Sequence, residues 1–288
     1  MPLTRVEALP RLPKRPEESH KGMYGAVLVL AGSRGMAGAA ALSGAAALRS
    51  GAGLVRILSP LEIQPTVASF DPSYMTYPVA QDGDGQVDYD GARKALDRFL
   101  PTTDVLAVGP GLGRSDGLAR LISWIVENVA LPLVLDADGL NNLGSASLAR
   151  AGGAPWIVTP HPGEMARLTG RTIAEIQGDR EGSAAALAKR LQAIVVLKGA
   201  KTVVTDGDQV FVNTTGNPGM ATAGAGDVLT GVIAALIGQK LSPFDAAVMG
   251  AYAHGLAGDI AKDSHGEMGM IAGDIVDSLP DTFAHLAM

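Results

Sequence analysis

Cysteine is absent from this 288-residue sequence, and aromatic residues make up only 4% of it. The lack of cysteine excludes disulfide bonds, zinc–thiolate sites and catalysis by a thiol. It also fits the reducing interior of a cell, so we expect a cytoplasmic protein. In contrast, the 37 glycines and the abundant alanine favour helices that pack closely on a sheet, with backbone turns that approach ligands.

Long apolar runs and clusters of positive charge are also missing. The formal charge is -6 at pH 7, and Lys and Arg form no dense cluster, which argues against nucleic acid or an anionic membrane as a partner. No run approaches the roughly 20 apolar residues of a membrane helix. The first 25 residues are Pro-rich and charged and lack the apolar core of a signal peptide. We therefore expect a soluble protein.

Short β-rich segments alternate with helix-length segments along most of the chain, which predicts an α/β fold with a mainly parallel sheet and helices on both faces. The predicted strands are Ala26–Ala31, Leu54–Leu58, Tyr74–Tyr77, Val105–Val108, Leu133–Leu135, Trp156–Thr159, Ile194–Lys198, Thr202–Thr205 and Gln209–Asn213. The predicted helices are Ala39–Ser50, Gly117–Val129, Ile173–Gln192 with a break at Gly178, Gly226–Gly238, Pro243–Asp263 and Gly273–Leu279.

A hairpin turn at Asp206–Asp208 adds antiparallel strands at one edge of this sheet. No long linker, internal repeat or low-complexity block interrupts the pattern. We predict a single domain over residues 1–288, in which residues 1–25 form an N-terminal extension packed on or near it.

The strongest candidate site is the glycine-rich segment that precedes a predicted helix. Gly224 and Gly226 flank Ala225, and their missing side chains allow backbone N–H groups to point at an anion, together with the positive end of the helix dipole. A capped helix after a flexible loop is the alternative, but an upstream Gly-Asn-Pro-Gly turn and two Thr hydroxyls extend the pattern. We predict a phosphate site here, with Asp227 as the base that accepts a proton from an attacking hydroxyl.

Two further segments follow predicted strands. In Thr-Pro-His-Pro-Gly-Glu, Glu164 is a candidate Mg²⁺ ligand beside the phosphates and His161 a candidate substrate contact. A turn with a Glu in the first turn of a helix and a surface His is the other interpretation. Lys198 and Gly199 suit a nucleotide groove, whereas a strand edge with solvated Lys198 and Lys201 is the alternative.

Three other strand-end turns carry weaker signals. Gly109–Gly113 and Gly32–Gly38 are as compatible with plain turns as with ligand loops, and neither is a dinucleotide-binding or Walker A motif. Asp136 and Asp138 are candidates for metal binding, which Asp-Gly turn chemistry explains about as well. Because ligands bind at the carboxyl ends of parallel strands, we expect all these turns to converge on one cleft.

These motifs resemble the ribokinase-like superfamily and, within it, the ADP-dependent NAD(P)H-hydrate dehydratase family. The strings Thr-Pro-His-Pro-Gly-Glu and Gly-Asn-Pro-Gly-Met-Ala-Thr are highly specific, and the resemblance extends from about residue 20 to the end of the chain. The other matching stretches are 20–25, 30–33, 49–53, 108–113, 134–141, 196–199 and 213–231. Residues 32–53 hold only a turn and a helix, so the fold should lack the β-lid of many sugar kinases.

The resemblance implies the following site residues. The family's adenylate site falls on Lys198, Gly199, Ala200, Lys201, Thr202 and Gly226. Its positions that bind hydrated nicotinamide cofactor fall on Gly38, Ala39, Gly111, His161 and Asp227. The family often has Gly-Gly-Thr-Gly-Asp where this chain has Ala223-Gly-Ala-Gly-Asp227, which removes one hydroxyl but leaves the backbone donors.

The resemblance also implies a reaction and its partners. Hydrated NADH or NADPH (NADHX or NADPHX) would be dehydrated with ADP as co-substrate and Mg²⁺ as cofactor, through a phosphorylated hydroxyl, yielding AMP and phosphate. A homotetramer is implied, as is a separate NAD(P)H-hydrate epimerase, because we expect that this chain is too short to carry one. The choices between ADP and ATP and between NADHX and NADPHX stay open. The alternative functions are an ATP-dependent small-molecule kinase of the same superfamily and a catalytically idle nucleotide sensor.

Overall fold

The centre of the molecule is one twisted sheet. The computed structural model describes residues 3–143 and 150–287, and within them ten strands lie in the order β1-β10-β9-β8-β7-β6-β5-β2-β3-β4. The strands are β1 (Thr4–Arg5), β2 (Ala26–Leu30), β3 (Leu54–Pro60), β4 (Met75–Val79), β5 (Val105–Val108), β6 (Leu133–Leu135), β7 (Trp156–Val158), β8 (Ile194–Leu197), β9 (Val203–Thr205) and β10 (Gln209–Val212).

Parallel pairing joins all strands from β8 to β4, whereas β9 is antiparallel to both β8 and β10. The mainly parallel sheet and the antiparallel hairpin near its edge were both predicted and are confirmed. The outermost strand differs from the prediction: β1 pairs with β10 in parallel. A strand of two residues is too short to produce a periodic pattern, so the sequence gives no signal for it.

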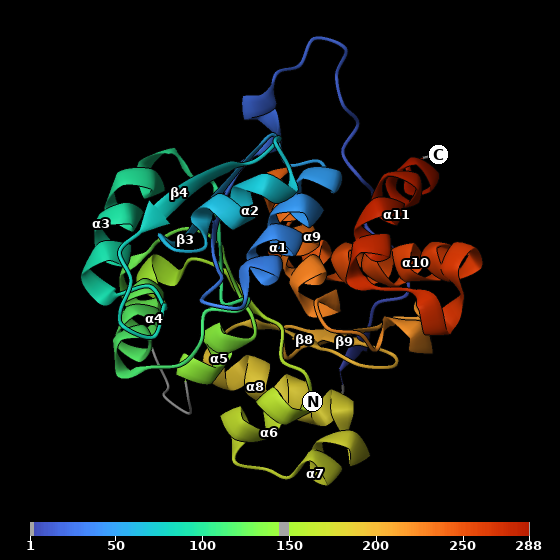
Figure 1. The fold of residues 1–288 in the computed structure, drawn as a ribbon. Helices are drawn as coiled ribbons and strands as arrows, with labels where there is room; N and C mark the ends of the chain where they lie inside the picture. Colours follow the sequence, from blue (N-terminus) through green and yellow to red (C-terminus); the bar gives the residue numbers. More distant parts are fainter. Residues whose placement is uncertain (1–2, 144–149, 288) are drawn as a thin grey trace.

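Helices cover both faces of the sheet, as predicted (Figure 1). The α-helices are α1 (Ala37–Arg49), α2 (Gln64–Phe70), α3 (Tyr89–Phe99), α4 (Asp116–Asn128), α5 (Asp138–Leu143), α6 (Pro162–Thr169), α7 (Ile173–Gly178), α8 (Arg180–Leu191), α9 (Ala225–Gly238), α10 (Pro243–Gly269) and α11 (Ala272–Leu286). One apolar core lies between the sheet and α1, α2, α9, α10 and α11, and the other lies under α3 to α8.

The apolar run of β2 serves both cores. Val27 and Val29 contribute to the core under α1 and α9, whereas Leu28 and Leu30 contribute to the opposite core, and all four are fully buried. This is the burial that an unbroken apolar strand predicts. None of the helices in the described part of the chain has the length and apolarity needed to span a membrane.

Four helices were not predicted, namely α2, α3, α5 and α6, and α11 is longer than expected. The break predicted near Gly178 is confirmed, because Asp179 ends α7 and caps α8 by accepting a hydrogen bond from the Gly182 N–H at 2.9 Å. Only α1 separates β2 from β3, which agrees with the absence of a β-lid.

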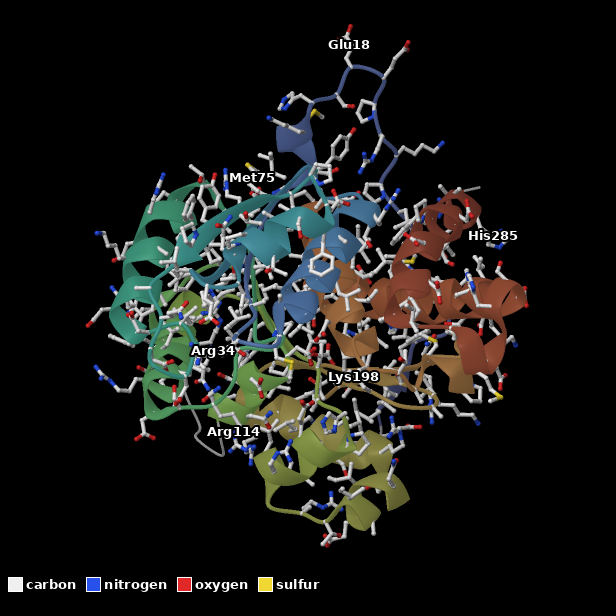
Figure 2. All side chains as sticks on the ribbon, viewed as in Figure 1. Glu18, Arg34, Met75, Arg114, Lys198 and His285 are labelled. Atoms are coloured by element: carbon white, nitrogen blue, oxygen red, sulfur yellow. The ribbon has the colours of Figure 1, made fainter. Side chains whose placement is uncertain are left out.

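The N-terminal extension contacts the rest of the chain at several points. Beyond the β1–β10 pairing, the Arg15 guanidinium donates to the Gly51 carbonyl at 2.6 Å and lies 3.9 Å from the centre of the Tyr24 ring. These contacts hold the extension at two separate points, and the segment around Glu18 projects away from the α/β core (Figure 2). The single-domain organisation itself stays a prediction.

Glycine permits a close contact between helices α1 and α9. A Cβ atom at Gly231 would lie 2.2 Å from the Ser43 carbonyl oxygen. We therefore expect Gly231→Ala to force the two helices apart and to lower the free energy of unfolding by about 1–3 kcal/mol, measured by urea titration. Gly178→Ala is the matched control, because no described atom lies within 4 Å of its added methyl. Equal stabilities for the two variants would contradict this packing account.

Candidate active site

The turn that opens α9 leaves its first backbone amides free for a ligand. Gly224 precedes the helix with φ 92°, a left-handed conformation that favours glycine, and no side chain caps it. Within residues 3–143 and 150–287, no protein acceptor bonds the N–H of Gly226 or Asp227, and the Ala225 N–H reaches only the Thr222 carbonyl at 3.5 Å. Such amides, aligned with the helix dipole, form an anion site.

The loop that leads into this turn is fixed to α10. The Asp259 carboxylate accepts hydrogen bonds from the Gly216 N–H at 2.9 Å and the Asn217 side chain at 3.0 Å. The Asn217 amide also donates to the Gly258 carbonyl, and Asn213 donates to the Ala251 carbonyl. The Gly-Asn-Pro-Gly segment is therefore held against a long helix, and the turn starts from a defined position.

Asp227 lies in the first turn of α9 and is partly buried. Its carbonyl accepts from the Ser43 hydroxyl at 3.1 Å, whereas its carboxylate has no hydrogen-bonding or ionic partner in the described part of the chain. Burial, reinforced by the negative charge of Asp136, raises the pKa of Asp227 to about 7, although Lys198 acts in the opposite direction. A carboxylate with this pKa can act as a general base near neutral pH.

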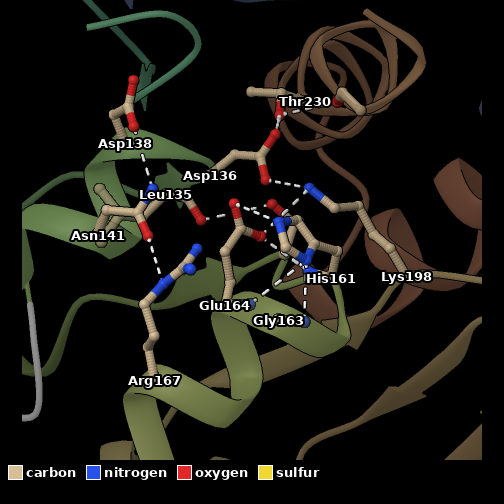
Figure 3. A network of polar contacts seen from close by, with 12 residues as sticks. Leu135, Asp136, Asp138, Asn141, His161, Gly163, Glu164, Arg167, Lys198 and Thr230 are labelled. Atoms are coloured by element: carbon tan, nitrogen blue, oxygen red, sulfur yellow. Dashed lines mark hydrogen bonds and ion pairs between the residues drawn. The ribbon is translucent and has the colours of Figure 1, made fainter. Parts of the chain in front are cut away.

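Two buried carboxylates and a partly buried ammonium meet next to the turn, at the ends of neighbouring elements (Figure 3). The Lys198 ammonium lies 2.5 Å from Asp136 Oδ1 and 3.9 Å from Glu164 Oε2. Burial alone would lower the pKa of Lys198, but Asp136 and Glu164 outweigh it and raise that pKa. Lys198, labelled in Figure 2, therefore carries a positive charge. Only 17% of its side chain is exposed and β8 is an inner strand of the sheet, so the interpretation of it as a solvated strand-edge lysine is not supported.

His161 and Glu164 form the start of α6. The Glu164 Oε2 atom accepts from the His161 N–H at 2.8 Å, and His161 Nδ1 accepts from the Gly163 and Glu164 amides, which makes a capping box. Burial, followed by the charges of Lys198 and Arg167, lowers the pKa of His161. With Nδ1 as an acceptor, the ring proton lies on Nε2, 3.4 Å from Glu164 Oε1.

A resident metal site is not evident from these contacts. Both Glu164 oxygens face protein donors, and the described residues contain no group of three His, Asp or Glu side chains placed to hold a metal ion. Burial raises the pKa of Glu164, although Lys198 opposes this shift. Glu164 as an Mg²⁺ ligand stays a prediction, and it requires the side chain to release one of its present partners.

The remaining nucleotide-site candidates lie in the tight turn after β8. Lys201 has φ 55°, Thr202 donates its hydroxyl to the Gly199 carbonyl at 2.9 Å, and Lys201 is exposed. Arg180, which was not predicted, donates to the carbonyls of Leu197 and Lys198 at 2.9 and 3.2 Å and supports the turn from α8. Arg180 and Thr202 therefore fix the shape of this turn.

Three of the residues predicted to bind the hydrated cofactor, Gly38, Ala39 and Gly111, lie at or against the start of α1, whereas His161 begins α6. A Cβ atom added at Gly111 would lie 2.9 Å from the Cβ atom of Ala39, whereas one added at Gly38 would meet no described atom within 4 Å. Asp138 accepts from the Gly113 N–H at 2.9 Å and from the Asn141 side chain at 3.0 Å, so it holds the Gly109–Gly113 loop, as the Asp-Gly turn interpretation predicted.

The strand-end turns thus lie close together. Gly111 meets the start of α1, Ser43 of α1 bonds the Asp227 carbonyl, and Gly226 next to it faces the Lys198 ammonium. Lys198 pairs in turn with Asp136 and Glu164, and Thr230 bonds Asp136. Two buried residues of this group were not predicted in the roles they have. Asp136 was considered for metal binding or a turn but pairs with Lys198, and Thr230 was not singled out but donates its hydroxyl to Asp136 at 2.9 Å. The sequence signal for the Asp136–Lys198 pair was an Asp directly after the predicted strand β6 and a Lys at the end of the predicted strand β8.

A mainly parallel sheet with an open anion turn next to an unpaired carboxylate defines a ribokinase-like protein. The chain superposes on a ribokinase-like superfamily protein from Enterococcus faecalis with a TM-score of 0.81 and 26% identity, covering 96% of this chain and 92% of the other. The sequence pattern of the NAD(P)H-hydrate dehydratase family matches residues 27–281. The chain belongs to the NAD(P)H-hydrate dehydratase family.

Individual relatives support this assignment. An ADP-dependent (S)-NAD(P)H-hydrate dehydratase from Neisseria meningitidis is 39% identical over 91% of this chain and 86% of its own length. A bifunctional NAD(P)H-hydrate repair enzyme from Moorella thermoacetica is 46% identical over 99% of this chain, which spans 54% of that relative. An ADP/ATP-dependent NAD(P)H-hydrate dehydratase from Bacillus subtilis, co-crystallised with ATP/Mg²⁺, has a TM-score of 0.85 and 34% identity, covering 96% and 95% of the chains.

The raised pKa of Asp227 makes a prediction for stability. At pH values between 3.8, the ordinary pKa of Asp, and about 7, Asp227 keeps a proton in the folded state that it has released in the unfolded chain. The stability that this bound proton contributes is therefore lost as pH rises through this range. Asp227→Asn carries no charge. We expect it to unfold with a free energy higher than the wild type by on the order of 1–3 kcal/mol at pH 8, and by much less at pH 4, in urea titrations.

The control is Asp263→Asn, which removes an exposed carboxylate of α10 and should change the free energy of unfolding by less than about 0.5 kcal/mol. If Asp227→Asn gave no advantage at pH 8, the carboxylate would not be desolvated as described.

Proposed function

We propose that this protein is an ADP-dependent NAD(P)H-hydrate dehydratase that repairs hydrated nicotinamide cofactors. The observation that carries the proposal is the unpaired carboxylate of Asp227 in the same helical turn as amides without a protein acceptor. This arrangement supports a role for Asp227 as a base next to a site for phosphoryl oxygens. Membership of the family and the name of the Neisseria meningitidis relative supply the reaction.

The first chemical step is proton transfer. Hydrated NADH or NADPH carries a hydroxyl at C6 of the nicotinamide ring, and hydroxide is a poor leaving group. Asp227 takes the hydroxyl proton while the oxygen attacks the terminal phosphorus of ADP, and the bond from that phosphorus to AMP breaks. A pKa of about 7 leaves much of the base ionised at neutral pH and still able to accept the proton.

Charge on the transferring phosphoryl group is stabilised by two kinds of donor. The amides of Gly226 and Asp227 point out of the start of α9, and the Lys198 ammonium lies close to Gly226, since a Cβ there would lie 3.2 Å from Lys198 Nζ. Fixed dipoles and a fixed cation in a partly buried site are effective because little reorganisation accompanies the reaction.

The second step is elimination. The ring nitrogen lone pair expels phosphate from C6, and loss of the C5 proton restores the C5–C6 double bond of NADH or NADPH. The water removed from the cofactor ends in the phosphate, so the products are AMP, phosphate and the reduced dinucleotide. The proposed contacts for the hydrated cofactor are Gly38, Ala39, Gly111 and His161, along the lidless side of the site.

Mg²⁺ enters this proposal with the nucleotide, because Mg²⁺ is commonly bound by one or two carboxylates together with substrate phosphates. Glu164 is the proposed protein contact, direct or through water. We also propose that the chain works with an NAD(P)H-hydrate epimerase activity, consistent with the bifunctional names of its relatives. The homotetramer and the cytoplasmic location stay predictions.

The decisive experiment incubates the protein with NADHX and either ADP or ATP, and follows the recovery of near-ultraviolet absorbance from NADH. We expect recovery together with AMP and free phosphate when ADP is supplied. The rate constant kcat/KM should rise with pH through about 7, as Asp227 loses its proton. Asp227→Asn should keep nucleotide binding and lose turnover by about 10²- to 10⁴-fold. A stable phosphorylated product without NADH would instead indicate a kinase.

The role of Glu164 can be tested without loss of the helix cap. Glu164→Gln keeps an oxygen to accept from the His161 N–H, as Gln does in other capping boxes, but removes the charge. We expect a several-fold higher Mg²⁺ concentration for half-maximal turnover and an unchanged melting temperature. Glu175→Gln, in the exposed capping box at the start of α7, is the matched control. An unchanged Mg²⁺ requirement in Glu164→Gln would exclude this metal contact.

A further inference from the structure

Asp136 has a side chain that the proposed mechanism does not use, although the residue is fully buried just after β6. Its backbone is fixed on both sides, since its N–H donates to the Val108 carbonyl at 3.0 Å and its carbonyl accepts from the Gly139 N–H at 2.8 Å. The Gly109–Gly113 loop also packs directly against this backbone, because a Cβ added at Gly109 would lie 1.8 Å from the Asp136 carbonyl oxygen. The carboxylate therefore starts from a rigid position.

Each carboxylate oxygen of Asp136 has its own partner (Figure 3). Oδ1 pairs with the Lys198 ammonium at 2.5 Å, and Oδ2 accepts from the Thr230 hydroxyl at 2.9 Å. Thr230 is fully buried on α9, one helical turn after Gly226, and Lys198 directly follows β8. Asp136 thus connects the end of β6 to both the end of β8 and the helix that carries the anion turn.

The Lys198 ammonium is directed to the anion turn by this pairing. Nζ would lie 3.2 Å from a Cβ at Gly226, and Oδ2 of Asp136 3.7 Å from the same atom, so the absence of a side chain at Gly226 leaves the ammonium open to the turn. The other carboxylate near it, Glu164, is more distant at 3.9 Å. The ammonium therefore adds a full positive charge to the partial charge of the helix start.

Stability alone is a poor explanation for this arrangement. Removing a Lys and an Asp from water costs about as much as their attraction returns, so a buried ion pair seldom adds net stability. A lysine on its flexible four-carbon chain would otherwise be free to turn toward Glu164 or Asp227. What the pair does achieve is a single location for the ammonium.

We propose that Asp136, held by Thr230, is a positioning residue that fixes the Lys198 ammonium against the Gly226 turn, where it receives the terminal phosphate of the nucleotide. Asp136 does not touch the nucleotide and acts only through Lys198. The inference rests on the proposed function to the extent that a nucleoside diphosphate binds at this turn.

A double-variant cycle tests this dependence. The dissociation constant of ADP with Mg²⁺, in the absence of NADHX, is measured by calorimetry for the wild type, Asp136→Asn, Lys198→Met and the double variant. We expect each single variant to bind ADP about 10- to 100-fold more weakly, as for the loss of a charged contact. The double variant should bind no more weakly than Lys198→Met alone, because groups that act as one unit are not additive.

Thr230 provides a second measurement that does not remove a charge. We expect Thr230→Val to weaken ADP binding several-fold and Thr230→Ser, which keeps the hydroxyl, to restore it. Thr282→Val is the matched control, because Thr282 is fully buried on α11 and its hydroxyl bonds only the Ser278 carbonyl of its own helix. Should Asp136→Asn fail to fold, the double variant removes both charges, and its comparison with Lys198→Met decides.

The inference is overturned if losses in the two single variants add, if Asp136→Asn binds ADP like the wild type, if Thr230→Ser is as impaired as Thr230→Val, or if the wild type does not bind ADP. Failure of the proposed function has a different signature: the ADP cycle holds, but NADHX is not converted to NADH. Conversion of NADHX by the wild type with an additive cycle would reject the positioning role and keep the function.

Discussion

One ammonium group lies among three buried or partly buried carboxylates, and this imbalance of charge determines the chemistry of the site. Lys198 pairs closely with Asp136 and more distantly with Glu164, and no ion pair joins it to Asp227 in the described part of the chain. The surplus negative charge, together with burial, keeps the pKa of Asp227 near 7. Under the proposed function, ADP would add negative charge to an already acidic region, which favours its binding as a complex with Mg²⁺.

The packing of α9 against α1 determines where these charged groups lie. Asp227 and Thr230 both belong to α9, which can approach α1 closely because Gly231 has no side chain to meet the Ser43 carbonyl. The Ser43 hydroxyl, in turn, donates to the Asp227 carbonyl. The abundant small residues thus bring the start of α9 to a fixed distance from the strand ends. Hydrogen bonds of moderate strength then hold the polar groups of the site in position.

Local patterns in the sequence predicted the parts of the site that are local in space. The glycines around Ala225 predicted an open helix start, and an unbroken apolar run predicted a strand buried on both faces. A Glu in the first turn of a helix was the less favoured interpretation of Glu164, and the structure shows that this Glu completes a capping box with His161. The Asp136–Lys198 pair joins residues 62 positions apart and depends on the strand order β6-β7-β8, which no local pattern specifies. The two-residue β1 lies below the length at which any periodicity exists.

The features that make the site reactive all oppose folding. Amides at the start of α9 lack protein acceptors, Asp227 is desolvated without a partner, and a buried ion pair returns little net stability. The two apolar cores on either side of the sheet must offset these terms, and the strands that lead into the site are among their most buried parts. The carboxyl ends of the strands are where both conditions hold, since the backbone is rigid up to its last paired residue and the polar groups beyond it are free to bind.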